Sequence, residues 1–232
     1  MLRLGLLGGM SWESSALYYR LANEVVRERL GGLHSAECVL YSVDFDAVEK
    51  MQAEGRWDDA GRLLAGAARS LELAGADLLL LCTNTMHKVA GVIEAAVTIP
   101  LLHVADATGA AARRAGLRRV GLLGTAYTME QDFLRGRLAA AGLTVLVPGA
   151  QDRAAVHRVI FDELCRGVLR EESRHEFRRI IGRLVDSGAE GIALSCTEIE
   201  LLIGPDDSPV PLLPSTRLHV EAAVDRSLRG PP

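Results

Sequence analysis

The sequence has few aromatic residues and few cysteines, and each shortage excludes a class of protein. Aromatic residues make up 4% of the 232 residues, with no polybasic run and no aromatic RNA-binding signature, so we expect no nucleic-acid partner. The 4 cysteines are widely spaced, with neither a CxxC pair nor zinc-finger spacing, so we expect no metal site. Free thiols persist in a reducing compartment, and we therefore expect a cytoplasmic protein.

Long apolar runs are absent as well. The apolar stretch at the start of the chain is too short to span a bilayer and runs into a glycine pair and a helix start. We therefore expect neither a membrane span nor a cleaved signal peptide. The remaining composition, 49% hydrophobic and 24% charged with a net charge of -4, is that of an ordinary globular protein.

Short apolar runs alternate with longer amphipathic stretches along the chain. The run at 77–81 is continuously apolar, which is typical of a parallel strand buried on both faces. Ser11 is a suitable N-cap for a helix that ends at the glycine pair Gly31 and Gly32. Strands alternating with helices predict an α/β fold with helices on both faces of a parallel sheet. We expect strands at 3–7, 38–43, 77–81, 101–104, 120–123, 191–194 and 211–213, and further helices at 58–74, 129–141, 154–165, 172–187 and the C-terminus.

Three short segments recur in the same order about half a chain apart. Their nearly constant offset is hard to assign to chance, and it indicates a duplicated fold. We therefore predict two similar three-layer domains, 1–115 and 116–232, related by a pseudo-two-fold axis, with the C-terminal helix packing on the first. The matching segments are 5–8 with 121–124, 74–77 with 187–190, and 100–102 with 211–213.

The repeat makes Thr83 in the first half equivalent to Cys196 in the second. Each follows a buried parallel strand, and ligands of open α/β sheets bind at the carboxyl ends of strands. A pseudo-two-fold axis would let the two side chains face a shared cleft, which is the active site that we expect between the domains. One group would remove a proton from a carbon and the other would deliver one to the opposite face. The pair therefore predicts inversion at a stereocentre without a cofactor.

Several motifs resemble the signature segments of the aspartate/glutamate racemase family. The resemblance implies a two-domain, PLP-independent enzyme, often a homodimer, that racemises acidic amino acids with two bases, usually cysteines. Thr83 falls on the first of these cysteines and Cys196 on the second, and a subgroup of similar racemases carries the same Thr/Cys pair. Cys165 falls where other members often place a lysine for the distal carboxylate of the substrate. The motifs are CTNTMH at 82–87, CTEIELL at 196–202, GLLGGMSWES at 5–14, LLGTAYTME at 122–130, and VDFDAVEKMQAEGRW around Gln52.

The two predicted catalytic residues differ in their chemistry. A thiol, with an ordinary pKa of about 8.5, is a usable base after modest lowering of that pKa, whereas a threonine hydroxyl is a poor base without an activator. We therefore expect the Cys196 thiolate to remove the α-proton of one enantiomer, and Thr83 to donate or relay a proton on the other face. The family resemblance implies that the favoured substrates are L-aspartate, L-glutamate or both. We expect the substrate-binding residues to be Met10, Gln52, Asn84, Thr85, Thr125, Thr128, Thr197 and Glu198.

Most of these site residues also have a plain structural interpretation. Cys196 would be a buried core cysteine, and Thr83 would be a turn or cap residue. The other structural interpretations are helix caps for Asn84 and Thr85, turn residues for Thr125 and Thr128, a core position for Met10, an exposed position for Gln52, and a solvated glutamate complementing a helix dipole for Glu198. Two other functions fit the same fold. One is a decarboxylase or isomerase of small dicarboxylates with a single cysteine, and the other is an inactive protein that only binds an amino acid. The reactivity of Cys196 separates catalysis from binding.

Overall fold

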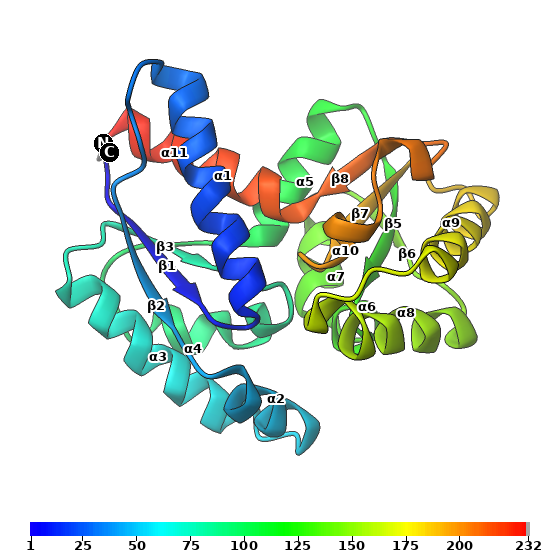
Figure 1. The fold of residues 1–232 in the computed structure, drawn as a ribbon, viewed down its shortest axis with the longest axis horizontal. Coiled ribbons are helices and arrows are strands. Elements are labelled where there is room, and N and C mark those ends of the chain that lie inside the picture. Colours follow the sequence, from blue (N-terminus) through cyan, green and yellow to red (C-terminus); the bar gives the residue numbers. More distant parts are fainter. Residues whose placement is uncertain (231–232) are drawn as a thin grey trace. The chain divides into compact units, whose positions relative to one another are not determined.

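The computed structural model describes residues 1–230, and these form two compact units. The first unit contains residues 1–103 and the residues from His219 onward, and the second contains Val104–Leu218. Each has a four-stranded parallel sheet, and the strand orders, β2-β1-β3-β4 and β6-β5-β7-β8, are the same (Figure 1). The predicted α/β fold of two similar parallel-sheet domains is confirmed. The division falls after His103, whereas the sequence repeat suggested a boundary after residue 115.

The first unit has helices on both faces of its sheet. On one face, Leu80 and Cys82 pack with Tyr18 and Val220. Leu79 and Leu81 point the other way and pack with a second set of helices. The strands are β1 (Leu4–Gly8), β2 (Cys38–Ser42), β3 (Leu78–Leu81) and β4 (Leu101–Leu102). The first face has α1 (Trp12–Leu30) and α11 (Ser215–Arg229), of which the part from His219 onward belongs to this unit. The other helices are α2 (Phe45–Ala53), α3 (Trp57–Leu73), the 3₁₀ turn η1 (Thr85–Val89) and α4 (Ala90–Glu94).

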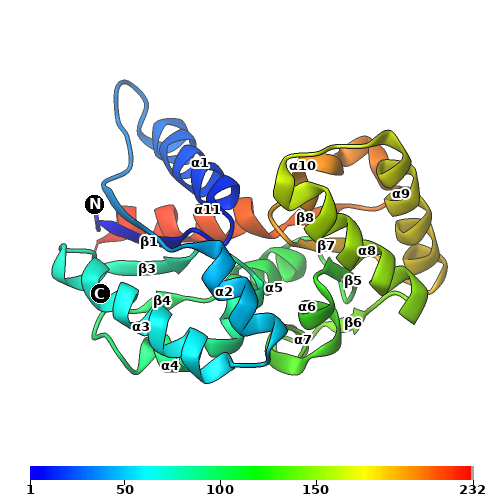
Figure 2. The ribbon, with the colours of Figure 1, turned by 60° about the horizontal axis from the view of Figure 1, so that its bottom comes forward.

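The second unit repeats this three-layer arrangement (Figures 1 and 2). Ile192 and Leu194 pack on one face with Ile160 and Phe177, while Ala193 packs on the other with Leu138. The strands are β5 (Arg119–Gly124), β6 (Thr144–Leu146), β7 (Gly191–Ser195) and β8 (Leu212–Pro214). The helices are α5 (Val104–Arg114), α6 (Ala126–Glu130), α7 (Asp132–Ala140), α8 (Ala150–Asp162), α9 (Glu171–Asp186) and α10 (Ile199–Leu202), with 3₁₀ turns η2 (Leu164–Arg166) and η3 (Pro205–Asp207).

Several elements differ from the sequence prediction. The strand predicted at 101–104 is only two residues long, because α5 already begins at Val104. The helix predicted at 129–141 is two helices, α6 and α7, that meet at Gln131, whose backbone is extended. The helix predicted at 154–165 begins earlier, at Ala150, and ends at Asp162 before the turn η2. Strand β6 and helix α2 were not predicted.

Helix termini follow the local signals more closely. Ser11 is the N-cap of α1, where its side chain accepts a hydrogen bond from the Ser14 backbone N–H. Gly31 follows the last residue of α1 with φ of 73°, a left-handed conformation that a side chain disfavours. Of the helices within residues 1–230, none combines the length and the apolar character that a bilayer crossing requires.

Candidate active site

Thr83 lies at the carboxyl end of the buried strand β3. Leu79 and Leu81 point to one face of the sheet, and Leu80 and Cys82 point to the other. Cys82 is fully buried, and burial raises the pKa of its thiol, so this cysteine is an inert core residue. The alternation expected of a strand is therefore observed, and Cys82 does not take the place of Thr83. Thr83 itself is 8% exposed, and its backbone N–H donates to Leu81 at 2.8 Å.

The residues after Thr83 form the 3₁₀ turn η1. Asn84 occupies the N-cap position of this turn, but within the described part of the chain its side chain makes no capping hydrogen bond. The capping interpretation of Asn84 is therefore wrong. Asn84 and Thr85 are both buried, at the end of the sheet where Thr83 lies.

Gln52 and Met10 reach the same segment of the first unit. Gln52 is buried on α2, and its Nε2 donates to the Met86 sulfur at 2.9 Å. The alternative interpretation of Gln52 as an exposed residue is therefore wrong, because Gln52 lies on a buried position of α2, a helix that the sequence did not predict. Met10 packs in the apolar cluster that also contains Met86, as its core interpretation predicts. The fold thus brings Gln52 and Met10 to the turn that follows Thr83.

Cys196 has the position in the second unit that Thr83 has in the first. It follows β7, and it packs on the same face as Ile192 and Leu194. Strand β7 pairs with β5 as β3 pairs with β1, with Leu123 opposite Leu194 and Leu7 opposite Leu81. Cys196 is 8% exposed. The repeat read from the sequence therefore corresponds to equivalent places in two equivalent sheets.

A carboxylate and a hydroxyl accompany the Cys196 thiol. Glu198 Oε2 accepts a hydrogen bond from Cys196 Sγ at 3.0 Å and another from Thr197 Oγ1 at 2.7 Å. Glu198 is buried at the N-cap position of α10, where within the described residues it makes no capping hydrogen bond. The interpretation of Glu198 as a solvated glutamate is therefore wrong, and its carboxylate orients the thiol.

The protonation of Cys196 differs from the sequence expectation. Burial raises the pKa of the Cys196 thiol well above its ordinary value, and the negative charge of Glu198 raises it further. The expected lowering of this pKa is not observed, because the sequence places Glu198 near the thiol but does not show that the thiol is buried, which is the larger cause of the raised pKa. The thiol is therefore protonated at neutral pH in this structure, and its proton already points to an acceptor, the Glu198 carboxylate.

Thr125 and Thr128 lie at the end of β5, the neighbour of β7. Thr125 is the N-cap of α6, where its Oγ1 accepts from the Thr128 backbone N–H at 3.3 Å. Their hydroxyls are 3.1 Å apart, and both residues are buried. Thr125 therefore caps α6, and Thr128 lies within that helix. His157 Nδ1 accepts from the Ala126 backbone N–H at 3.1 Å, a contact that was not predicted because a partner 31 residues away leaves no local signal in the sequence.

Burial keeps His157 suited to this role as an acceptor. It lowers the pKa of the imidazole, so Nδ1 stays unprotonated and able to accept at neutral pH.

Cys165, in η2, packs against the apolar cluster that contains Cys196. Among the described residues, no group of three or more His, Cys, Asp and Glu side chains is arranged to hold a metal ion.

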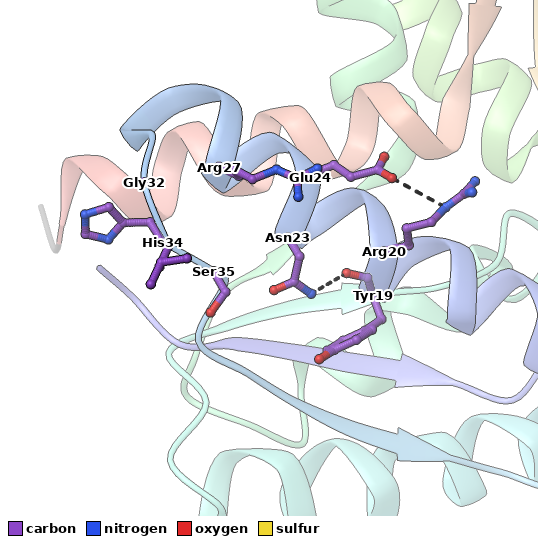
Figure 3. A pocket seen from close by; sticks show the side chains of 9 residues that line it. Tyr19, Arg20, Asn23, Glu24, Arg27, Gly32, His34 and Ser35 are labelled. Carbon is purple, nitrogen blue, oxygen red and sulfur yellow. Dashed lines mark hydrogen bonds and ion pairs between the residues drawn. The ribbon is translucent and has the colours of Figure 1, made fainter.

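A cavity of about 570 Å³ lies elsewhere, on the outer side of α1 (Figure 3). It is lined by the second half of α1 and the loop after it, including Asn23, whose side chain donates to the Tyr19 carbonyl at 2.7 Å. Arg20 and Glu24 form an ion pair along its rim. No predicted site residue lines this cavity, so it is not the candidate active site.

The buried Cys196–Glu198 pair has the features of an acid/base group, and the two units share one α/β arrangement. A model of the Asp/Glu/hydantoin racemase family matches residues 7–223. A Yersinia pestis protein assigned as an Asp/Glu racemase is 52% identical, with a TM-score of 0.91 over 98% of this chain and 100% of that chain. An aspartate racemase homologue from Pyrococcus horikoshii OT3 is 32% identical, with a TM-score of 0.85 over the same shares. The aspartate racemase of Picrophilus torridus is 19% identical and shares the fold, with a TM-score of 0.78 over 98% of this chain and 94% of that chain.

The chain therefore belongs to the Asp/Glu/hydantoin racemase family. It is an enzyme, a PLP-independent amino-acid racemase of the isomerase class. The family resemblance inferred from the motifs is confirmed.

The pKa of Cys196 predicts how the thiol reacts. Because the pKa is raised, alkylation of Cys196 by iodoacetamide should keep accelerating above pH 9. Glu198→Gln removes the adjacent negative charge and should accelerate alkylation at pH 8 by about threefold to tenfold. Peptide mass spectrometry distinguishes Cys196 from the other cysteines, and exposed Glu172→Gln on α9 is the control. A parent rate that levels off below pH 8 would contradict this prediction.

Glu200 predicts a pH dependence of stability. Its Oε1 accepts from the Thr216 backbone N–H at 2.9 Å in the first turn of α11, and burial raises its pKa to about 7. The folded state therefore holds a proton that the unfolded state has already lost, so the free energy of unfolding falls as pH rises toward and through 7. Glu200→Gln keeps the acceptor and removes the charge.

The variant should therefore be more stable than the parent at pH 8, by on the order of 1–3 kcal/mol, and should match it near pH 4.5. Urea unfolding at both pH values measures the difference, with exposed Glu172→Gln as the control. A Glu200→Gln effect of the same size at both pH values would show that the charge of Glu200 is not responsible.

Proposed function

We propose that this racemase acts on L-aspartate, L-glutamate or both by two-base proton transfer at Cα. Cys196 is the base on one face of the substrate, and Thr83 is the proton donor or relay on the other. The observation that carries the proposal is the buried Cys196–Glu198 pair at the end of β7, at the place equivalent to Thr83 at the end of β3. The matches to proteins described as Asp/Glu and aspartate racemases support the choice of substrate.

The first half of the reaction uses the thiol and its carboxylate. The Cys196 S–H proton passes along the existing hydrogen bond to Glu198 Oε2, which leaves a thiolate. The thiolate takes the α-proton of the L-enantiomer and becomes a thiol again, while the C–H electron pair stays on Cα and spreads into the carboxylate. A substrate ammonium group next to this pair favours the thiolate, because a positive charge opposes the effect of Glu198.

The second half of the reaction uses Thr83. Its hydroxyl proton is delivered to the opposite face of Cα, which forms the D-enantiomer. A solvent proton then restores the Thr83 hydroxyl, and Glu198 returns its proton to solvent. The enzyme therefore ends the cycle in its starting state. A threonine hydroxyl is a far weaker base than a thiolate. Removal of the α-proton from D-enantiomers is therefore slower, and the enzyme is asymmetric.

The remaining predicted residues bind the substrate. We propose that the hydroxyls and backbone N–H groups at the strand ends hold the carboxylate whose charge develops during the reaction, as donors at the starts of helices and turns do in other enzymes. The residues that supply these donors are Asn84, Thr85, Thr125, Thr128 and Thr197. Gln52 and Met10 shape the first unit's side of the site next to η1.

A racemisation screen tests this function. Aspartate and glutamate enantiomers, other amino acids and a malonate-type acid are incubated with the parent in deuterated water, and inversion and α-deuterium exchange are followed. Cys196→Ala should lower inversion of the L-substrate by at least about 100-fold, because a positioned base contributes that much. Thr83→Ala should lower inversion while exchange into the recovered L-substrate persists.

The control is Cys38→Ala, which removes a half-buried thiol from β2 and should leave turnover unchanged. Full activity in Cys196→Ala would overturn the function, and equal exchange from both enantiomers would overturn the asymmetry. Binding of an amino acid without exchange would identify an inactive binding protein. Release of CO₂ from the malonate-type acid without racemisation would identify a decarboxylase.

We also propose that the protein is a cytoplasmic homodimer. All 4 cysteines are free, which suits a reducing compartment. Strand β2 is an edge strand, and large apolar side chains are exposed on it and on the nearby α1 and its following loop, a pattern that often marks an interface. These side chains are Trp12, Tyr19, Leu33, Leu40 and Tyr41.

Light scattering measures the assembly directly. The parent should have twice the mass of one chain, and Leu40→Lys with Tyr41→Lys should give monomers, because charge on an edge strand opposes pairing. The control is Leu73→Lys, which places a charge at an exposed leucine at the end of α3. A monomeric parent at micromolar concentration would rule the dimer out.

A further inference from the structure

Three buried histidines lie together behind Thr83 in the first unit. His87 comes from η1, His103 follows β4, and His219 comes from α11. The ring of His87 is 4.3 Å from that of His103 and 5.9 Å from that of His219, measured between centroids. Each histidine is at most 3% exposed. Residues so far apart in sequence gather here only because the fold brings three elements to the carboxyl end of β3.

His87 holds the backbone of Thr83. The His87 Nδ1 atom is 2.7 Å from the Thr83 carbonyl oxygen, and because a carbonyl only accepts, Nδ1 carries the hydrogen. The backbone N–H of His87 donates to the Asn84 carbonyl, three residues earlier, as in a 3₁₀ turn. It therefore does not donate to the Thr83 carbonyl, which accepts from the His87 ring. The Thr83 N–H is held by Leu81. Both peptide groups beside the Thr83 Cα are therefore fixed, and with them the direction of its side chain.

The neighbours of His87 are fixed in their turn. His219 Nε2 is 2.8 Å from the Leu102 carbonyl, so Nε2 is the donor. The other ring nitrogen of a neutral His219 then accepts from the Tyr18 hydroxyl, at 2.9 Å. His219 meets the His87 ring at 65°, and His103 packs against it at 57°. A residue of α11 and the residue after β4 thus restrict the orientation of the His87 ring.

We propose that His87 is a positioning residue for proton delivery by Thr83, held in orientation by His103 and His219. The inference rests on the proposed function, in which Thr83 serves one face of the substrate and Cys196 the other. Loss of the His87 hydrogen bond should therefore slow inversion of the L-substrate, which needs Thr83. It should spare α-deuterium exchange into the recovered L-substrate, which needs only Cys196.

The test compares four variants by the ratio of inversion to exchange from the L-substrate in deuterated water. His87→Leu should lower this ratio by about tenfold or more, because a misplaced group loses catalytic contact. His87→Asn places an amide N–H near the Nδ1 position and should stay within about threefold of the parent. His87→Gln places its amide near the Nε2 position and should behave like His87→Leu. His34→Leu, at an exposed position in the same unit, should match the parent.

The ratio separates positioning from stability, because a partly unfolded enzyme loses inversion and exchange by the same factor. An unchanged ratio in His87→Leu would overturn the inference and leave the proposed function intact. If His87→Leu does not fold, the comparison of His87→Asn with His87→Gln decides, and equal ratios in these two variants would overturn it. A parent that neither inverts nor exchanges would overturn the proposed function and this inference together.

Discussion

The parallel pairing of two buried central strands in each unit is the constraint on which the site depends. β3 and β7 are covered by helices on both faces, and their backbone groups are used within the sheets. Side chains along such strands are committed to the apolar layers. Thr83 and Cys196 lie just past the ends of these two strands. The same geometry brings the turns after β1 and β5 to the carboxyl edges of their sheets.

The second determining feature is the pairing of a buried thiol with a buried carboxylate. Cys196 Sγ donates a hydrogen bond to Glu198 Oε2 at 3.0 Å, and the apolar cluster around the thiol opposes a second negative charge. This environment keeps the thiol protonated until an acceptor and a compensating positive charge are available, a condition that an amino-acid substrate with its ammonium group satisfies. In the proposed mechanism, the resting enzyme is therefore protected from forming an isolated thiolate.

The two halves differ most in how their key residues are supported. In the second unit a charged group, Glu198, contacts the reactive side chain itself. In the first unit the support reaches the backbone of Thr83 through His87, and a hydroxyl donor needs placement more than it needs a nearby charge. At equivalent places in the duplicated fold, a nearby charge therefore acts on Cys196, whereas a hydrogen bond fixes the backbone position of Thr83. This difference matches the unequal chemistry of a thiol and a hydroxyl.

Sequence patterns determined the features that depend on near neighbours or on repetition. The continuous apolar run predicted β3, and the repeated segments predicted two similar sheets with Thr83 and Cys196 at equivalent places. Tertiary packing decided the rest. Gln52 is buried where its side chain meets Met86 of η1, and β6 pairs with β5 in the sheet. The raised pKa of Cys196 and the histidines behind Thr83 were not predictable, because both arise from groups brought together in space. Periodicity records which face of an element is apolar, whereas desolvation and hydrogen bonding depend on what the folded chain places against that face.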